Sequence, residues 1–181
     1  LAGQRIAIAR DAAYAFIYPA NLETLQALGA ELCFFSPLAG DALPDCDALW
    51  LPGGYPELYG AALSANSALW RDVRQHVAAG KPALAECGGM MSLFDSIVDQ
   101  AGTAHRFAGL LPGRAVMQAK LAGLGTQFVS LPEGRLAGHT FHYSRCETSL
   151  APLCHASSAD GHAGETIFRQ QRLTASYLHF Y

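Results

Sequence analysis

Short apolar runs, separated by polar and glycine-rich turns, dominate the first half of the chain. Arg5–Ala9, Glu31–Phe35, Ala48–Leu51 and Pro82–Glu86 are each four or five residues long and rich in apolar side chains. Runs of this length and composition are typical of strands buried within a parallel sheet. The pattern therefore predicts four such strands.

Helical periodicity fills the intervals between these runs. Leu69, Val73 and Val77 recur every four residues within Ser67–Ala79, so a helix there has one apolar face and ends at Gly80. Three shorter helices are also predicted: one capped by Asn21 with Leu22, Leu25 and Leu28 on one face, one over Glu57–Leu63, and one that follows Cys87 and runs through Phe94.

Strands that alternate with helices at this spacing indicate βαβ units. The predicted fold is α/β, an open and mostly parallel sheet with helices on both faces. The pattern changes after Gly102, where short β-prone runs are separated by Gly, Pro and Ser: Arg114–Gln118, Thr126–Leu131, Leu136–His142, Thr166–Arg169 and Leu173–Leu178. We expect these runs to form additional short strands within the same domain, residues 1–181.

Composition excludes several classes of protein. The chain has 181 residues, 51% hydrophobic, 15% charged, and a formal charge of −3, which argues against disorder and offers no basic surface for nucleic acid. No apolar run reaches the length of a membrane span. Five cysteines without a CxxC pair or a signal sequence predict free thiols in the cytoplasm and no metal site. Because the chain starts at Leu1 and stops at Tyr181 beside strand-like runs, we expect an excised or truncated piece.

Cys87 is the first candidate for chemistry. It stands between a predicted buried strand and the pair Gly88-Gly89, where a helix is expected to begin. This is the pattern of a nucleophile elbow, in which small residues permit a tight turn. A helix N-terminus would lower the pKa of the thiol and present backbone amides to an oxyanion. The alternative interpretation is a buried cysteine before a helix.

The turn Pro52-Gly53-Gly54 follows the preceding predicted strand. Ligands of open α/β sheets bind beyond the carboxyl ends of the strands, where this turn and Cys87 would meet. Its amides could complete an oxyanion hole, although a plain strand-to-loop turn has the same pattern.

A base for Cys87 would come from the histidines. His179 ends the run Ala175–Tyr181, whereas His139 and His142 lie in Gly138–Ser144, and the pattern favours His142 and His179 equally. The remaining histidines lie in polar contexts that predict solvation: His76, His105, His155 and His162. Neither GxxxxGK[ST] nor GxGxxG occurs, so no nucleotide site is predicted in this chain.

Five segments together resemble a known family. RIAIARDAAYAFIYPANLETL, LWLPGGYPELY, LAECGGMM, GHTFHYSRCE and ASYLHFY are similar, in this order, to the glutamine amidotransferase domain of cobyrinate or hydrogenobyrinate a,c-diamide synthases. These enzymes form part of the CobB/CobQ-type branch of the class I, or triad, glutamine amidotransferases, whose fold is flavodoxin-like.

The resemblance implies roles for particular residues. Cys87 would attack the side-chain amide of glutamine, and His179, rather than His142, would be its base. Gly53, Gly54 and Gly88 would form the oxyanion hole. The candidates for positioning the substrate are Tyr55, His142 and Tyr143.

Three positions depart from the wider pattern. Class I enzymes have Pro-Glu after the histidine, where this chain has Phe180 and Tyr181; Gln is replaced by Met91, and relatives carry an acidic residue in place of Thr140. The first two departures are traits of the branch. A third triad member is therefore missing or supplied elsewhere.

The resemblance also implies partners. An N-terminal P-loop synthetase domain, absent from this chain, would use ATP and Mg²⁺ to activate the a and c carboxylates of cobyrinic or hydrogenobyrinic acid in cobalamin biosynthesis, and would hold the corrin. The alternatives are a cobyric acid synthase-type or cell-wall amidating glutaminase, or a DJ-1/PfpI-like protein with a redox or hydrolytic cysteine.

Overall fold

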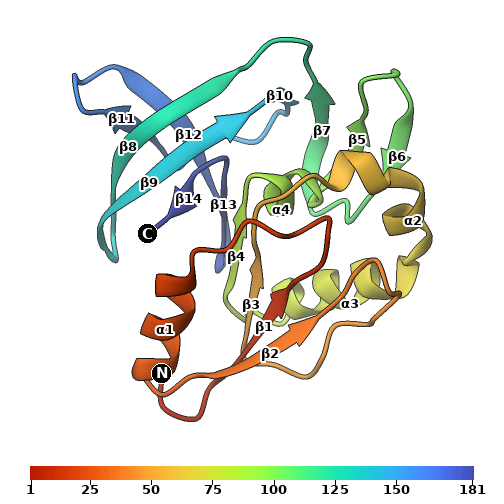
Figure 1. Cartoon of the computed structure of the whole chain (residues 1–181), viewed down its shortest axis with the longest axis vertical. Helices are drawn as coiled ribbons and strands as arrows, with labels where there is room; N and C mark the ends of the chain where they lie inside the picture. Colours follow the sequence, from red (N-terminus) through yellow and green to blue (C-terminus); the bar gives the residue numbers. More distant parts are fainter.

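The computed structural model describes all 181 residues, which form a long curled sheet, a small second sheet and a few helices (Figure 1). In chain order the elements are β1 (Arg5–Ala9), α1 (Pro19–Ala27), β2 (Glu31–Phe35), β3 (Ala48–Leu51), the 3₁₀ turn η1 (Pro56–Tyr59), α2 (Gly60–Ala65), α3 (Ser67–Ala78), β4 (Ala83–Glu86), α4 (Gly88–Met91), β5 (Phe94–Val98), β6 (Ala104–Arg106), β7 (Leu111–Met117), β8 (Gly123–Leu131), β9 (Gly134–His142), β10 (Ser144–Glu147), β11 (Cys154–Ser158), β12 (Ala163–Gln170), β13 (Leu173–Ser176) and β14 (His179–Phe180).

The long sheet has ten strands in the order β14-β9-β8-β11-β12-β13-β4-β3-β1-β2. Its β13-β4-β3-β1-β2 portion is parallel, and contains the four strands predicted from the first half of the chain. The portion from β14 to β12, which joins β13, is antiparallel. The predicted α/β fold and the additional strands of the second half are confirmed. Most of those strands join the long sheet and make it mixed, whereas the run Arg114–Gln118 falls mostly in β7 of the second sheet.

Helices cover both faces of the parallel portion. On one face, Leu69, Val73 and Val77 of α3 are buried in the main core, as their four-residue spacing predicts. On the other face, Leu22 and Leu25 of α1 pack against a small cluster of β1 and β3 side chains. The second face is covered only partly, and an apolar groove remains beside α1.

The α3 face provides a test of core packing. Replacing Leu69, which is fully buried, by alanine is expected to lower the free energy of unfolding by about 2–5 kcal/mol, because a cavity replaces well-packed methyl groups. Leu58→Ala is the control, since its side chain is 71% exposed and should change stability by less than about 0.5 kcal/mol. Urea denaturation of both variants measures the difference; equal effects would contradict the packing.

Two predicted elements differ from the structure after Cys87. The helix α4 is a single turn that ends at Met91, because Phe94 begins β5 of a separate four-stranded sheet, β10-β7-β5-β6. The run Leu173–Leu178 is divided: β13 ends at Ser176, and the chain then leaves β4 to pair with β9 as β14.

The start of α1 also differs from the prediction. The helix begins at Pro19 with Tyr18 at its N-cap, and Pro at the first position fits because its missing N–H has no helical partner. Asn21 is not the cap; its Nδ2 donates to the carbonyl of Phe180 at 2.7 Å. Leu28 follows the helix and is exposed. No helix of the structure is both long and apolar enough to cross a membrane.

Candidate active site

Cys87 lies at a sharp turn between β4 and α4. Its φ of +46° is a left-handed conformation that costs a non-glycine residue energy and is typical of functional positions. The turn is possible only because small residues follow it: a Cβ at Gly88 would lie 2.7 Å from the carbonyl oxygen of Gly54, and one at Gly89 would overlap the carbonyl of Leu51. The structure therefore has the local geometry of a nucleophile elbow.

The thiol of Cys87 is protonated in the resting protein. Its side chain is almost buried, and burial raises the pKa to about 12, with Glu57, Glu165 and Glu86 raising it further. A hydrogen bond from the Gly88 amide acts in the opposite direction. The expected lowering by a helix N-terminus is thus wrong in sign, because α4 is one turn long and cannot outweigh burial.

The loop after β3 passes beside this turn. Its backbone is held by Phe16, whose N–H donates to Gly53 O at 3.0 Å, and by Tyr55, whose N–H donates to Ala13 O at 2.9 Å. The Gly53 amide faces the carbonyl of Phe16 across an isolated antiparallel bridge, whereas the Gly54 amide donates to no backbone carbonyl. The Gly54 amide is therefore available to a ligand, as an oxyanion hole requires.

His179 contacts the same loop at Gly53. Its ring contacts Gly53 so closely that a Cβ there would overlap Cε1, and the ring of Phe16 lies 4.2 Å away between centroids. Only 4% of the residue is exposed, and Nδ1 has no hydrogen-bond partner. Burial, followed by the charges of His139 and His142, lowers the pKa of His179 to about 4, so the imidazole is neutral at pH 7.

Cys87, His179 and the loop Gly53–Gly54 thus come together around the carboxyl ends of β3 and β4. This is the edge at which open α/β sheets bind ligands. No carboxylate bonds Nδ1 of His179, in agreement with the absence of a Glu after it in the sequence. The arrangement can supply a thiol, a neutral imidazole and the unpaired amide of Gly54, but the imidazole lacks a side-chain partner.

His142 is placed differently from His179. Its Nδ1 bonds Ser144 O at 2.9 Å, its Nε2 bonds Glu165 Oε1 at 2.8 Å, and its ring is stacked on Tyr177 with centroids 3.7 Å apart. Neither nitrogen is free for a substrate. Thr140, which stands where relatives have an acidic residue, donates to the same Glu165 oxygen. No pattern in the sequence indicated Glu165, because it lies in β12 whereas His142 lies in β9.

The other candidate residues are found in several settings. Tyr55 and Tyr143 are exposed and could contact a ligand. His76, predicted to be solvated, is instead buried, with Nε2 bonded to Pro82 O and Nδ1 3.7 Å from Cys46 Sγ, because it faces the sheet from the end of α3. All five cysteines are free. No group of three or more His, Cys, Asp or Glu side chains is placed to hold a metal ion.

Gly53→Ala tests the contact between the loop and His179. The methyl group would displace the imidazole, so we expect any chemistry that uses this ring to slow by roughly tenfold or more. Gly40→Ala is the control: its φ of +86° makes alanine strained, but the Cβ would meet open space. Gly40→Ala should therefore lose stability and keep its activity. If both variants retain activity, His179 is not confined by Gly53.

Comparisons with known proteins identify the family of the chain. The profile of the CobB/CobQ-like glutamine amidotransferase domain matches residues 5–181. The chain is 56% identical over 182 residues to a hydrogenobyrinate a,c-diamide synthase of Stutzerimonas stutzeri, and 49% identical over 184 residues to a cobyrinate a,c-diamide synthase of Herminiimonas arsenicoxydans. All of the chain is covered in both cases, but only 42% of each relative.

Solved structures show the same fold. A glutamine amidotransferase from Thermotoga maritima superposes with a TM-score of 0.66 at 12% identity, over 97% of this chain and 75% of that one. Another, from Methylobacillus flagellatus, has a TM-score of 0.64 at 16% identity, over 99% and 70% of the two chains. The family itself follows from the profile over residues 5–181 and the 56% identical relative: the chain belongs to the CobB/CobQ-like glutamine amidotransferase domain family.

Proposed function

We propose that this chain is the glutaminase portion of an ATP-dependent amidotransferase, with Cys87 as nucleophile and His179 as general base and acid. One observation carries the proposal: the left-handed elbow at Cys87 and the buried His179 ring meet around the Gly53–Gly54 loop. A thiol nucleophile, a neutral imidazole base and backbone amides for the oxyanion are the groups required to cleave an amide bond.

The first half of the reaction forms a thioester. Cys87 gives its proton to His179 while Sγ bonds to Cδ of glutamine, and the amides of Gly53, Gly54 and Gly88 stabilise the oxyanion. His179 then gives the proton to the amide nitrogen as the C–N bond breaks. Ammonia leaves, and a γ-glutamyl thioester remains on Cys87.

Water completes the second half. It gives a proton to His179 and adds to the thioester carbonyl, the C–S bond breaks, and the sulfur recovers the proton as glutamate leaves. The balance is glutamine and water to glutamate and ammonia. Tyr55 and Tyr143 are proposed to contact glutamine, since both are exposed. His142 is proposed to position the substrate indirectly, by holding neighbouring residues in place, because both its ring nitrogens are already hydrogen-bonded within the protein.

The acceptor of ammonia would be bound by another part of the same polypeptide. The chain spans about two fifths of the curated relatives that it matches, 42% of the two reported above. We propose that an N-terminal P-loop synthetase domain uses ATP and Mg²⁺ to activate the a and c carboxylates of cobyrinic or hydrogenobyrinic acid. The names of the relatives favour this acceptor over cobyric acid or a cell-wall substrate. A cytoplasmic location fits the five free thiols.

The test is labelling by 6-diazo-5-oxonorleucine, a glutamine analogue that alkylates amidotransferase nucleophiles. We expect one label per chain, mapped by peptide mass to Cys87, together with glutamate release from glutamine. The remainder of the Stutzerimonas stutzeri relative, added in trans, should accelerate both. Absence of label at Cys87 under all of these conditions would overturn the proposal.

A further inference from the structure

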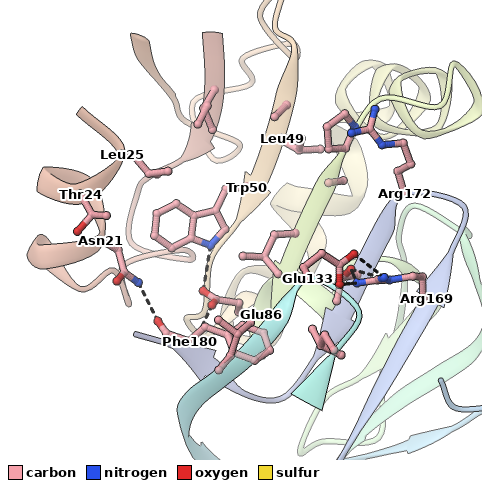
Figure 2. Close-up of a pocket in the computed structure, with 18 of the residues that line it drawn as sticks. Asn21, Thr24, Leu25, Leu49, Trp50, Glu86, Glu133, Arg169, Arg172 and Phe180 are labelled. Carbon is pink, nitrogen blue, oxygen red and sulfur yellow. Dashed lines mark hydrogen bonds and ion pairs between the residues drawn. The ribbon is translucent and has the colours of Figure 1, made fainter. Parts of the chain in front are cut away.

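Glu86 is a buried carboxylate that the proposed chemistry leaves unused. It precedes Cys87, is 2% exposed, and lines the apolar groove of about 630 Å³ beside α1. Both oxygens accept hydrogen bonds: Oε1 from the backbone N–H of Phe180 at 2.9 Å, and Oε2 from Nε1 of Trp50 at 2.9 Å. Figure 2 shows these two bonds meeting at Glu86.

Stability alone does not account for this carboxylate. No cation offsets its charge; burial raises the pKa of Glu86 to about 7, against the two hydrogen bonds, which lower it. Burying a carboxyl group without an opposite charge is costly, and apolar residues of similar volume often replace such groups with no loss of stability. A buried carboxylate of this kind is therefore a candidate for a functional role.

Glu86 connects the segment that carries Cys87 with the segment that carries His179. Glu86 directly precedes Cys87 in the chain. Its side chain accepts a hydrogen bond from the backbone N–H of Phe180, the residue after His179. The pairing of β4 with β13 ends at Glu86 and Ser176, and the Cys87 N–H donates to Ser176 O. Beyond that point the chain crosses to β9, so the Glu86–Phe180 bond is a direct link from the end of β4 to β14.

β14 itself is held by few interactions. It has two residues and only two register pairs with β9, His139 and Gly138. The carbonyl of Phe180 is bonded by Asn21 of α1, as Figure 2 also shows. Since Nδ1 of His179 has no partner, nothing bonds the imidazole through that atom. The ring is placed by its backbone, by Gly53 and by Phe16.

We propose that Glu86 is a positioning residue, which holds His179 beside Cys87 by bonding the backbone N–H of Phe180. A carboxylate acting on the main chain would thus do what the triad carboxylate of other class I enzymes does on the imidazole. The inference rests on the proposed glutaminase function.

The structure permits a test by rescue. In Glu86→Gln, the amide oxygen can accept from only one of the two donors, and the NH₂ group must face the other. In the Trp50→Phe background the indole donor is gone, so the Gln oxygen can accept from Phe180 N–H. We expect Glu86→Gln alone to lower kcat roughly tenfold to a hundredfold, whereas the double variant returns to within about threefold of Trp50→Phe.

Two further measurements separate positioning from a structural role. Glu86→Met in the Trp50→Phe background keeps an apolar side chain of similar length but cannot accept a hydrogen bond, and its kcat should stay low while thermal unfolding is unchanged or higher. The KM for glutamine should vary by less than about threefold among all variants, because Glu86 does not touch substrate.

Each failure has a distinct meaning. If wild-type protein is not labelled at Cys87 by 6-diazo-5-oxonorleucine, either alone or with the remainder of the relative in trans, the glutaminase proposal fails, and the role of Glu86 with it. If wild-type protein is labelled and Glu86→Gln keeps its kcat, only the positioning role is overturned. Recovery of kcat by Glu86→Met as fully as by Gln would also overturn it. If the Glu86→Met variant does not fold, the test rests on kcat of Glu86→Gln alone compared with kcat of Glu86→Gln in the Trp50→Phe background.

Discussion

Replacing Cys87 by alanine is expected to abolish glutamate release and labelling by 6-diazo-5-oxonorleucine, a loss of more than about a thousandfold. The reason is chemical: no other cysteine has the positive φ of the elbow, and a methyl group cannot form the thioester. The fold should survive, since Cys87 is a small residue in a buried position. Intact mass and thermal unfolding, measured on the same samples, separate loss of chemistry from loss of structure.

Cys33→Ala is the matched control, because this thiol is partly buried on β2, at the outer edge of the parallel portion. It should be labelled as the wild-type protein is. A second measurement uses the high pKa of Cys87, about 12. Iodoacetamide, which needs a thiolate and does not resemble glutamine, should react slowly with Cys87 at pH 8. Fast alkylation there, or persistent glutaminase activity in Cys87→Ala, would contradict the assignment.

The parts of the site that could be predicted are those encoded locally. A strand followed at once by small residues specifies a tight turn, so Cys87 and Gly53–Gly54 could be placed at strand ends from the sequence alone. Their meeting followed from the general rule for open α/β sheets. The four parallel strands and the α3 stripe were likewise predicted by short-range periodicity.

The parts that could not be predicted depend on contacts between distant residues. Glu86 and Phe180 are 94 positions apart, and Glu165 reaches His142 from a different strand. The periodicity of His142 and His179 was equivalent, so the choice of His179 came from the family resemblance, and the physical difference lies in the crossing of the chain from β13 to β9. The direction of the Cys87 pKa shift was predicted wrongly for the same reason. The local sequence indicates a helix N-terminus, but it does not show that the surrounding core buries the thiol and raises its pKa.

His179→Gln is expected to slow glutaminase turnover by roughly 10²–10⁴-fold, the usual contribution of a general base. Glutamine keeps much of the volume of the imidazole but cannot accept the thiol proton. His162→Gln is the control, since the side chain of His162 is 83% exposed and pairs only with the likewise exposed Asp160. Its turnover should match that of the wild-type protein.

The pH profile adds a sharper criterion. Burial, and then the charges of His139 and His142, lower the pKa of His179 to about 4 from an ordinary 6.5. A base must be neutral to accept a proton, so protonation of His179 itself should lower kcat/KM only nearer pH 4, and a fall near pH 7 would instead come from Glu86, whose pKa burial raises to about 7. His179 also favours the folded state above pH 6.5, and this contribution is lost as the pH falls through 4. His139→Ala should move the acid limb upward by removing one charge.

The residual rate of His179→Gln distinguishes a lost base from a damaged site. Without a base, the thiol of Cys87 must lose its proton to solvent, and below its pKa of about 12 the thiolate fraction grows with pH. Labelling of the variant should then rise by about tenfold per pH unit between pH 7 and 10, whereas the wild-type rate stays nearly flat. A flat residual rate would show that His179→Gln had disturbed the binding of glutamine. Wild-type-like labelling of His179→Gln at pH 7 would instead require another base, and Nε2 of His142 could serve only after leaving Glu165.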